Sequence, residues 1–263
     1  MSAAVQPAPR SGAWRRALEG NWVVLTTALL ATSLVMAMQP RSWRRPVTDA
    51  FWLALRLATI GSLVAVVVAA TVVGIGVVGQ ALFWLDEFGE RDVVRTTLVR
   101  VLVREVAPVT VGLVMLGRSG LIHLSELARM RADGTLRVLR AEGLDPSLFL
   151  AMPLVLALGI ATFCNAVVFT VLAVLIGYAA TALSGLTVQP LADFLLSLSR
   201  DLGTTGVLIL PLKSLLVGLV IGATIAATAL QPMRRDARLI LPHGFFRALI
   251  AMFVASALMS AML

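Results

Sequence analysis

Long runs of apolar residues separated by short polar segments dominate the pattern of this chain. Five such runs cover about 57 to 82, 93 to 116, 147 to 182, 205 to 230 and 244 to 263. Each run is long enough to cross a hydrocarbon layer roughly 30 Å thick, which takes about 20 residues of helix. Because lipid offers no partner for open strand edges, each run predicts a membrane-spanning helix. The pattern therefore predicts an all-α membrane protein with five transmembrane helices.

A sixth apolar run, over residues 21 to 39, has arginines on both sides. If it does not cross, segments 1 to 56, 117 to 145 and 231 to 247 share one side of the membrane and hold seven, five and four arginines, against one in each opposite connection. The positive-inside rule then places the N-terminus in the cytoplasm and the C-terminus in the periplasm. We therefore expect a cytoplasmic region over 1–56 with an interfacial helix, followed by a five-span domain over 57–263.

Composition and charge narrow the class of protein. The chain has 263 residues, of which 59% are hydrophobic and 14% charged, and this excludes an ordinary soluble domain. A net charge of +8 could suit nucleic acid, but the basic residues lie in clusters between apolar runs, so we expect no nucleic-acid partner. Cys164 is the one cysteine, which excludes an intrachain disulfide and a cysteine-based metal site. We expect no metal.

Two apolar runs carry further structural information. The run 147 to 182 would be roughly 54 Å long as one helix, so we expect it to tilt, bend or project beyond the bilayer. In the run 205 to 230, small residues at four-residue spacing predict a face on which another helix packs closely: Gly218, Gly222 and Ala226.

The polar segment 117–146 has an amphipathic helical pattern. Leucines recur at helical spacing around Leu124 and Leu127, and arginines and serine lie between them. A solvated loop is the simplest interpretation of such a charge run. The length and the amphipathic pattern favour a docking helix, with His123 on its polar face.

Four motifs in this region occur in a characteristic order. They are LVREVAPVTVGLVMLGRSG from Leu102, SELARMR from Ser125, LRAEGLDP from Leu139 and MPLVLA from Met152. This series resembles the MlaE/YrbE permease family of ABC lipid transporters. The residues that match the family pattern are Arg104, Glu105, Pro108, Gly117, Arg118, Gly120, Glu126, Leu127, Met130, Gly143, Asp145, Pro146 and Pro153. Lys213 also resembles the family's lysine in the fourth span, whereas DGTLRVL and Leu154 depart from the pattern.

The resemblance implies a fold and a function. The fold is an N-terminal interfacial (elbow) helix followed by five crossings, and the function is that of a permease subunit, not an enzyme. It implies movement of lipids, above all phospholipids, between the inner and outer membranes. The protein itself would be a multi-pass protein of the bacterial inner membrane. The implied partners are an ABC ATPase, an MCE-domain protein, a second permease copy (identical or a paralogue) and a small STAS-type accessory protein. No phosphate-binding loop surrounds Lys213, so no cofactor is expected here and ATP is bound by the partner.

The candidate residues fall into two functional groups, one implied by the resemblance and one suggested by charges inside a span. The segment 117–146 would contain the coupling helix that contacts the ATPase, with the candidates Gly117, Arg118, Gly120, Glu126, Met130, Asp145 and Pro146. Charges inside a span are costly and suggest function, so Arg100, Arg104 and Glu105 are candidates for the substrate cavity or its gate. Arg104 or Arg100 would meet a lipid phosphate, and Glu105 would pair with arginine or shape the gate. A structural salt bridge between helices explains these charges equally well.

Two other classes of function stay open. A secondary transporter would work without an ATPase. GRSG at 117–120 also matches the G-x-S-G of intramembrane serine proteases, with Ser119 as the nucleophile and His243 or His123 as the base. The arginines and glutamate that follow Ser119 disfavour the protease, whose serine should open a membrane-embedded helix.

Overall fold

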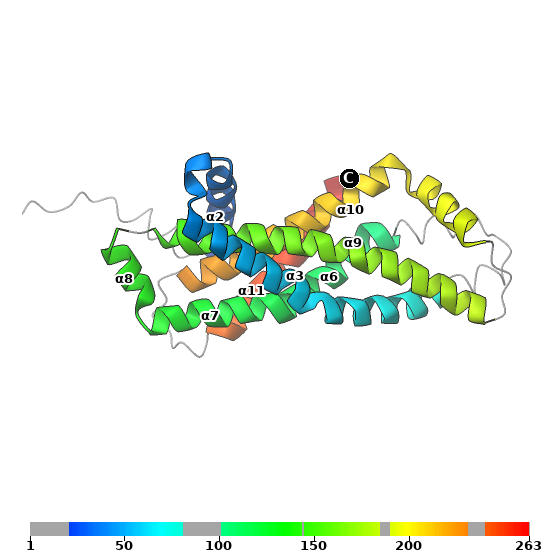
Figure 1. Ribbon diagram of the computed structural model, residues 1–263, viewed down its shortest axis with the longest axis horizontal. Helices are drawn as coiled ribbons and strands as arrows, with labels where there is room; N and C mark the ends of the chain where they lie inside the picture. The colour runs from blue at the N-terminus through cyan, green and yellow to red at the C-terminus, as the bar shows by residue number, and fades with distance from the viewer. Residues whose placement is uncertain (1–20, 81–100, 144, 185–189, 231–239, 263) are drawn as a thin grey trace, which may run out of the picture.

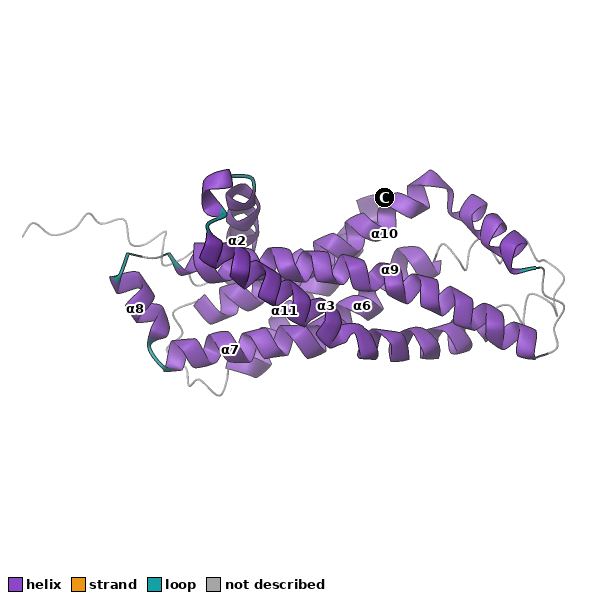
Figure 2. Cartoon of the chain, in the orientation of Figure 1, coloured by secondary structure: helices purple, strands orange, loops and turns teal. Residues whose placement is uncertain are grey.

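The computed structural model describes residues 21–80, 101–143, 145–184, 190–230 and 240–262. Within these ranges every regular element is a helix, and the connections between helices are short (Figure 2). The long helices run side by side along the longest axis of the molecule (Figure 1). This arrangement confirms the predicted all-α fold.

Five helical segments are long and apolar enough to cross a membrane. They are Arg45–Val77, Leu102–Ala132, Ser147–Leu183, Leu208–Leu230 and Ile240–Met262, which we call the first to fifth spans. The first span comprises α3 (Arg45–Val73) and part of η2 (Gly74–Gly79), and the third comprises η5 (Ser147–Ala151) and α9 (Met152–Leu183). The fourth span is the later part of α10 (Leu191–Leu230), and the fifth is α11 (Ile240–Met262). Their count agrees with the sequence-based prediction of five crossings.

The second span is built from four consecutive helical pieces. They are η3 (Leu102–Val106), α6 (Ala107–Met115), η4 (Leu116–Gly120) and α7 (Leu121–Ala132), with η3 and η4 forming π-helical turns. The span extends beyond the apolar run that ends near 116 because Leu124 and Leu127 bury one face of α7 while Arg129 remains exposed. The helix therefore continues where average hydrophobicity suggested a boundary.

The short helix α8 (Thr135–Ala141) joins the second span to the third. Gly134 and Gly143 on either side have φ angles of +79° and +76°, in the left-handed region that glycine adopts without steric cost. Pro146 follows just before η5, and the Asp145 carboxylate accepts a hydrogen bond from the Ser147 amide at 2.9 Å, which caps the third span. These residues fix α8 at one end of the bundle, here called the α8 end (Figure 1).

The N-terminal helix α2 (Trp22–Ala37) is shorter than the spans and lies across the long axis of the bundle (Figure 1). It packs on α9 and α10, where Leu30 contacts the cluster of Val155, Leu219 and Ala223. The turn to α3 is fixed by the Trp43 indole, which donates a hydrogen bond to the Ala37 carbonyl at 2.9 Å. The crosswise course agrees with an elbow helix and not with a sixth span.

Close approach between α9 and α10 depends on glycine. A Cβ at Gly218 would lie 2.5 Å from both the Leu158 carbonyl oxygen and the Thr162 hydroxyl, and one at Gly222 would lie 2.8 Å from the Val155 Cα. These contacts confirm the predicted small-residue packing face. α9 itself continues from Met152 to Leu183 as one helix, and Pro153 lies in its first turn, directly after the π-helical turn η5.

Gly203 divides α10 into two helical parts. Its φ of +61° and ψ of 177° are not helical, so the segment before it changes direction at this point (Figure 1). Phe194 in that first part contacts Tyr178 of α9, with ring centroids 5.1 Å apart, and packs beside Leu102. The connection that the sequence suggested before the fourth span is therefore largely helical.

Candidate functional site

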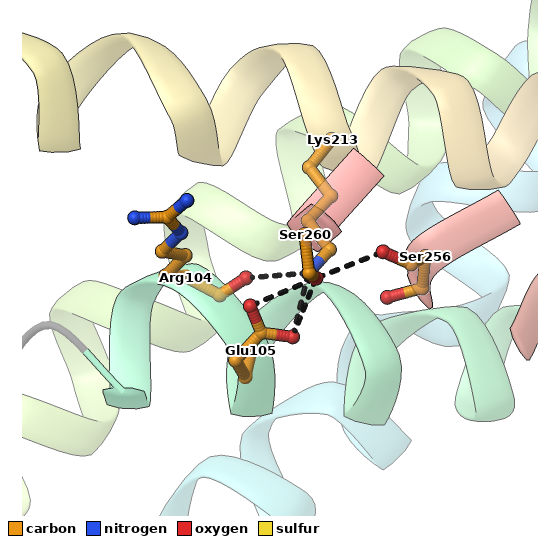
Figure 3. A network of polar contacts seen from close by, with 5 residues as sticks. All are labelled: Arg104, Glu105, Lys213, Ser256 and Ser260. Carbon is orange, nitrogen blue, oxygen red and sulfur yellow. Dashed lines mark hydrogen bonds and ion pairs between the residues drawn. The ribbon is translucent and has the colours of Figure 1, made fainter. Parts of the chain in front are cut away.

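A polar network joins the second, fourth and fifth spans near the C-terminal end of α11 (Figure 3). The Lys213 ammonium donates hydrogen bonds to a Glu105 carboxylate oxygen at 2.7 Å, to the Arg104 carbonyl at 2.9 Å and to the Ser260 hydroxyl at 2.6 Å. An ammonium has three N–H donors, so each finds an acceptor. The network therefore satisfies a cation that is almost fully buried.

The two charges of this network differ in exposure. The Lys213 side chain is 1% exposed, whereas that of Glu105 is 41% exposed. A buried charge in a span persists only when it is paired and hydrogen-bonded. Lys213 is thus held inside the bundle, and Glu105 presents part of its carboxylate at the surface of the chain.

Ser260 completes the network from α11. Its hydroxyl oxygen lies 2.9 and 3.0 Å from the two Glu105 carboxylate oxygens and 2.9 Å from the Ser256 carbonyl one turn earlier. Sequence reasoning missed Ser260, because a serine near the end of an apolar run carries no signal of a partner 155 residues away in the sequence. Lys213 was noticed only through the family resemblance.

The predicted cavity residues Arg104 and Glu105 make different contacts in the structure. Within the described residues the ion pair of Glu105 is with Lys213 and not with an arginine. The guanidinium of Arg104 points away from the network, while its carbonyl is held by Lys213 (Figure 3). Arg100 lies outside the described residues. Lys213 therefore fixes the backbone of Arg104, while the partly exposed Arg104 side chain lies outside the network.

The GRSG motif lies inside the bundle and not at a protease-like site. Ser119 is buried in η4, where its hydroxyl lies 2.7 Å from that of Ser62 on α3 and 3.4 Å from the Ala58 carbonyl. Its hydroxyl contacts are therefore with another serine and a backbone oxygen, and neither can act as a general base. This geometry supports a bridge between the first two spans.

The predicted coupling residues fall into three places. Gly117, Arg118 and Gly120 lie in η4 within the second span, and only Gly120 is packed, with a hypothetical Cβ 3.0 Å from Ile225. Asp145 and Pro146 form the start of the third span beside α8, as described above. Together these five residues flank the stretch of α7 and α8 and do not form one surface.

Glu126 and Met130 line a cleft together with His123. His123 was expected on the polar face of this helix, and that expectation is wrong, because the residue is 8% exposed. It lies on the same side of α7 as Leu124 and Leu127, and its Nδ1 is 3.9 Å from a Glu126 carboxylate oxygen. The single histidine of α7 therefore faces neighbouring helices.

Five membrane-length helices, two of them joined by an ion pair whose cation is buried, define a multi-pass membrane protein. Residues 51–262 match the family described as Permease MlaE, and the chain belongs to this family. Membership makes it the membrane permease of an ABC transporter, which works with partner subunits. A comparison with curated proteins finds no significant match.

Proposed function

We propose that this permease moves phospholipids between the inner and outer membranes of a bacterium, in complex with an ABC ATPase and an MCE-domain protein. The observation that carries the proposal is the arrangement around Arg104. Its carbonyl is fixed by buried Lys213 and its guanidinium points away from the paired charges. The backbone of Arg104 is thus held at one place on the span, and a guanidinium can donate two parallel hydrogen bonds to a phosphate group.

The adjacent ion pair supports the same function. Lys213 donates all three of its N–H groups to protein acceptors. It therefore holds the backbone at Arg104 and has no donor for a transported lipid. The Glu105 carboxylate is held by Lys213 and Ser260, away from the Arg104 guanidinium (Figure 3). A headgroup phosphate would therefore meet the guanidinium without a carboxylate beside it.

The remaining parts of the proposal concern orientation and partners. The α8 end would face the cytoplasm, because the arginines at the start of α3 (Arg44 and Arg45) and those of α7 and α8 lie at that end of the bundle. α8, held by Gly134 and Gly143, would contact the ATPase, and the network near Glu105 would open toward the periplasm and the MCE-domain protein. A second permease copy and a STAS-type protein would complete the assembly.

Purification with the natural partners tests the proposal. We expect the tagged chain, extracted in mild detergent, to bring with it an ATPase, an MCE-domain protein and phospholipid, all identified by mass spectrometry. Arg104→Glu should lower phospholipid recovery and transport while leaving the subunits associated. Arg56→Glu, on the exposed side of α3, is the matched control and should change neither. Unchanged transport in Arg104→Glu would contradict the role of Arg104, and a chain recovered without an ATPase would favour a secondary transporter.

A further inference from the structure

A cleft of about 230 Å³ lies between the first three spans near the α8 end, away from the Arg104–Glu105 site. His123 follows Glu105 by 18 residues along the second span, which corresponds to about 27 Å of helix. The cleft and the polar network are therefore at opposite ends of the same span. Any ligand of the cleft binds separately from one at Arg104.

The walls of the cleft are almost entirely apolar. Residues of α3, α7, η5 and the start of α9 form them, and the polar side chains among them are those of His123 and Glu126. On α3, Leu53 and Leu57 are 62% and 52% exposed, so the cleft opens sideways from the bundle and not along its axis. The mouth of the cleft therefore lies on the lateral surface of the bundle.

Glu126 is the one acidic side chain among the described residues that line this cleft. Its side chain is 51% exposed, and within the described residues its ion-pair partner is His123 at 3.9 Å, too far for a hydrogen bond. A carboxylate prefers a cationic donor within about 3 Å. The cleft thus combines a hydrocarbon-lined floor with one acceptor for a positively charged donor.

The depth of the cleft indicates the kind of ligand. Its lining residues lie between 2 and 12 residues from the ends of their helices at the α8 end, which is roughly 3 to 18 Å. These spans exceed the hydrocarbon thickness of about 30 Å, so this depth corresponds to the headgroup region and the upper acyl chains. Pockets that bury whole drug-sized ligands measure roughly 300–1,000 Å³, so this cleft takes part of a lipid.

We propose that this cleft binds a phospholipid with a primary ammonium headgroup, which donates a hydrogen bond to Glu126 while an acyl chain lies against Leu53 and Leu57. A primary ammonium fits because it supplies N–H donors, whereas a quaternary ammonium has none. An anionic headgroup without an amine would meet the carboxylate with like charge. The proposal does not depend on the transport function, because it concerns a lipid that binds while the protein is not transporting.

Native mass spectrometry of the purified full-length chain tests this site without nucleotide or partner proteins. The probes are phosphatidylethanolamine, phosphatidylcholine and phosphatidylglycerol with identical acyl chains. We expect phosphatidylethanolamine to bind in preference to the other two, and Glu126→Gln to reduce that preference by about tenfold, the effect of losing one charge-assisted hydrogen bond. Glu142→Gln, which changes an exposed acidic residue just after α8, is the matched control and should preserve it.

A second variant separates headgroup recognition from the apolar floor. Leu57→Trp should fill the cleft and lower adducts of all three lipids, while the thermal midpoint shows whether the protein remains folded. An unchanged preference in Glu126→Gln, or an equal loss in Glu142→Gln, would overturn the proposal. The proposal would also be overturned if Glu126→Gln kept the lipid preference but no longer recovered the ATPase in the purification described above. Glu126 would then contact a protein and not a lipid. Failure of transport in Arg104→Glu has no bearing on these binding measurements.

Discussion

Lys213 and Glu105 form an ion pair across 2.7 Å in which the cation is buried and the anion is half exposed. The asymmetry decides which partner the fold depends on more. Without Glu105, the buried ammonium would keep only two neutral acceptors, whereas without Lys213 the carboxylate can turn toward its exposed side. The two partners are therefore not equivalent in their contribution to stability.

This asymmetry predicts the order of two substitutions. Glu105→Leu should destabilise the protein by about 3 kcal/mol, because it leaves a buried charge uncompensated, and Lys213→Met should cost less. The double variant should cost less than the sum of the single variants, with a coupling of about 1–3 kcal/mol. Thermal unfolding of all four proteins in one detergent measures this cycle. Strict additivity would show that the pair contributes no mutual stabilisation.

Gly218 should not tolerate a larger side chain. Gly218→Ala places a methyl group 2.5 Å from the Leu158 carbonyl oxygen, so α9 and α10 must move apart at a cost of about 1–3 kcal/mol. Gly61→Ala is the matched control, because no atom lies within 4 Å of that hypothetical Cβ in α3. Thermal midpoints should fall for the first variant and hold or rise for the second. Equal midpoints would place the helices farther apart than described here.

Ser119 provides the test between a permease and a protease. Ser119→Ala removes the hydrogen bond with Ser62 and should cost about 1 kcal/mol in unfolding free energy, while lipid transport continues. Ser62→Ala should have a similar effect, and the double variant should add little to either. A protease would instead lose all activity with Ser119→Ala, so transport and peptide-cleavage assays on the same preparations decide between the two.

The glycines around α8 should matter for coupling. Gly143→Ala forces an L side chain into the left-handed region at about 1–2 kcal/mol, and this strain should displace α8. In the assembled transporter we expect lower transport per ATP hydrolysed, while the subunits still associate. Gly117→Ala is the comparison, since no atom lies within 4 Å of its hypothetical Cβ and the fold should accept it. A loss of coupling confined to Gly117→Ala would assign the contact to η4.

Much of the fold could be predicted from the sequence, and the reasons are physical. A membrane-spanning helix requires about 20 mostly apolar residues, and such runs are visible in the sequence. The predicted number of spans was therefore correct. The boundaries near α7 were not, because a helix that buries Leu124 and Leu127 can carry arginines on its other face. Average hydrophobicity does not record this division between faces.

The polar network was harder to predict than the helices. Charged residues in the second span were visible as candidates, but the partner of Glu105 comes from a span more than one hundred residues later, and no local pattern reports such a pairing. His123 shows the same limit, because one histidine among polar residues gave no sign of facing α3 and η5. Side-chain partners depend on helix rotation, which a single sequence leaves undetermined.

The second and fourth spans are tied together at both of their ends. Lys213 and Glu105 join them at one end, and at the α8 end the Arg131 guanidinium donates a hydrogen bond to the Ala229 carbonyl at 3.3 Å, in the last turn of α10. These ties are about 39 Å apart along the second span. In mechanical terms the two helices form a strut that resists sliding and twisting. We expect a displacement applied beside α8 to be carried along both helices, because the positive-φ glycines that interrupt regular helix, Gly134, Gly143 and Gly203, all lie outside these two spans.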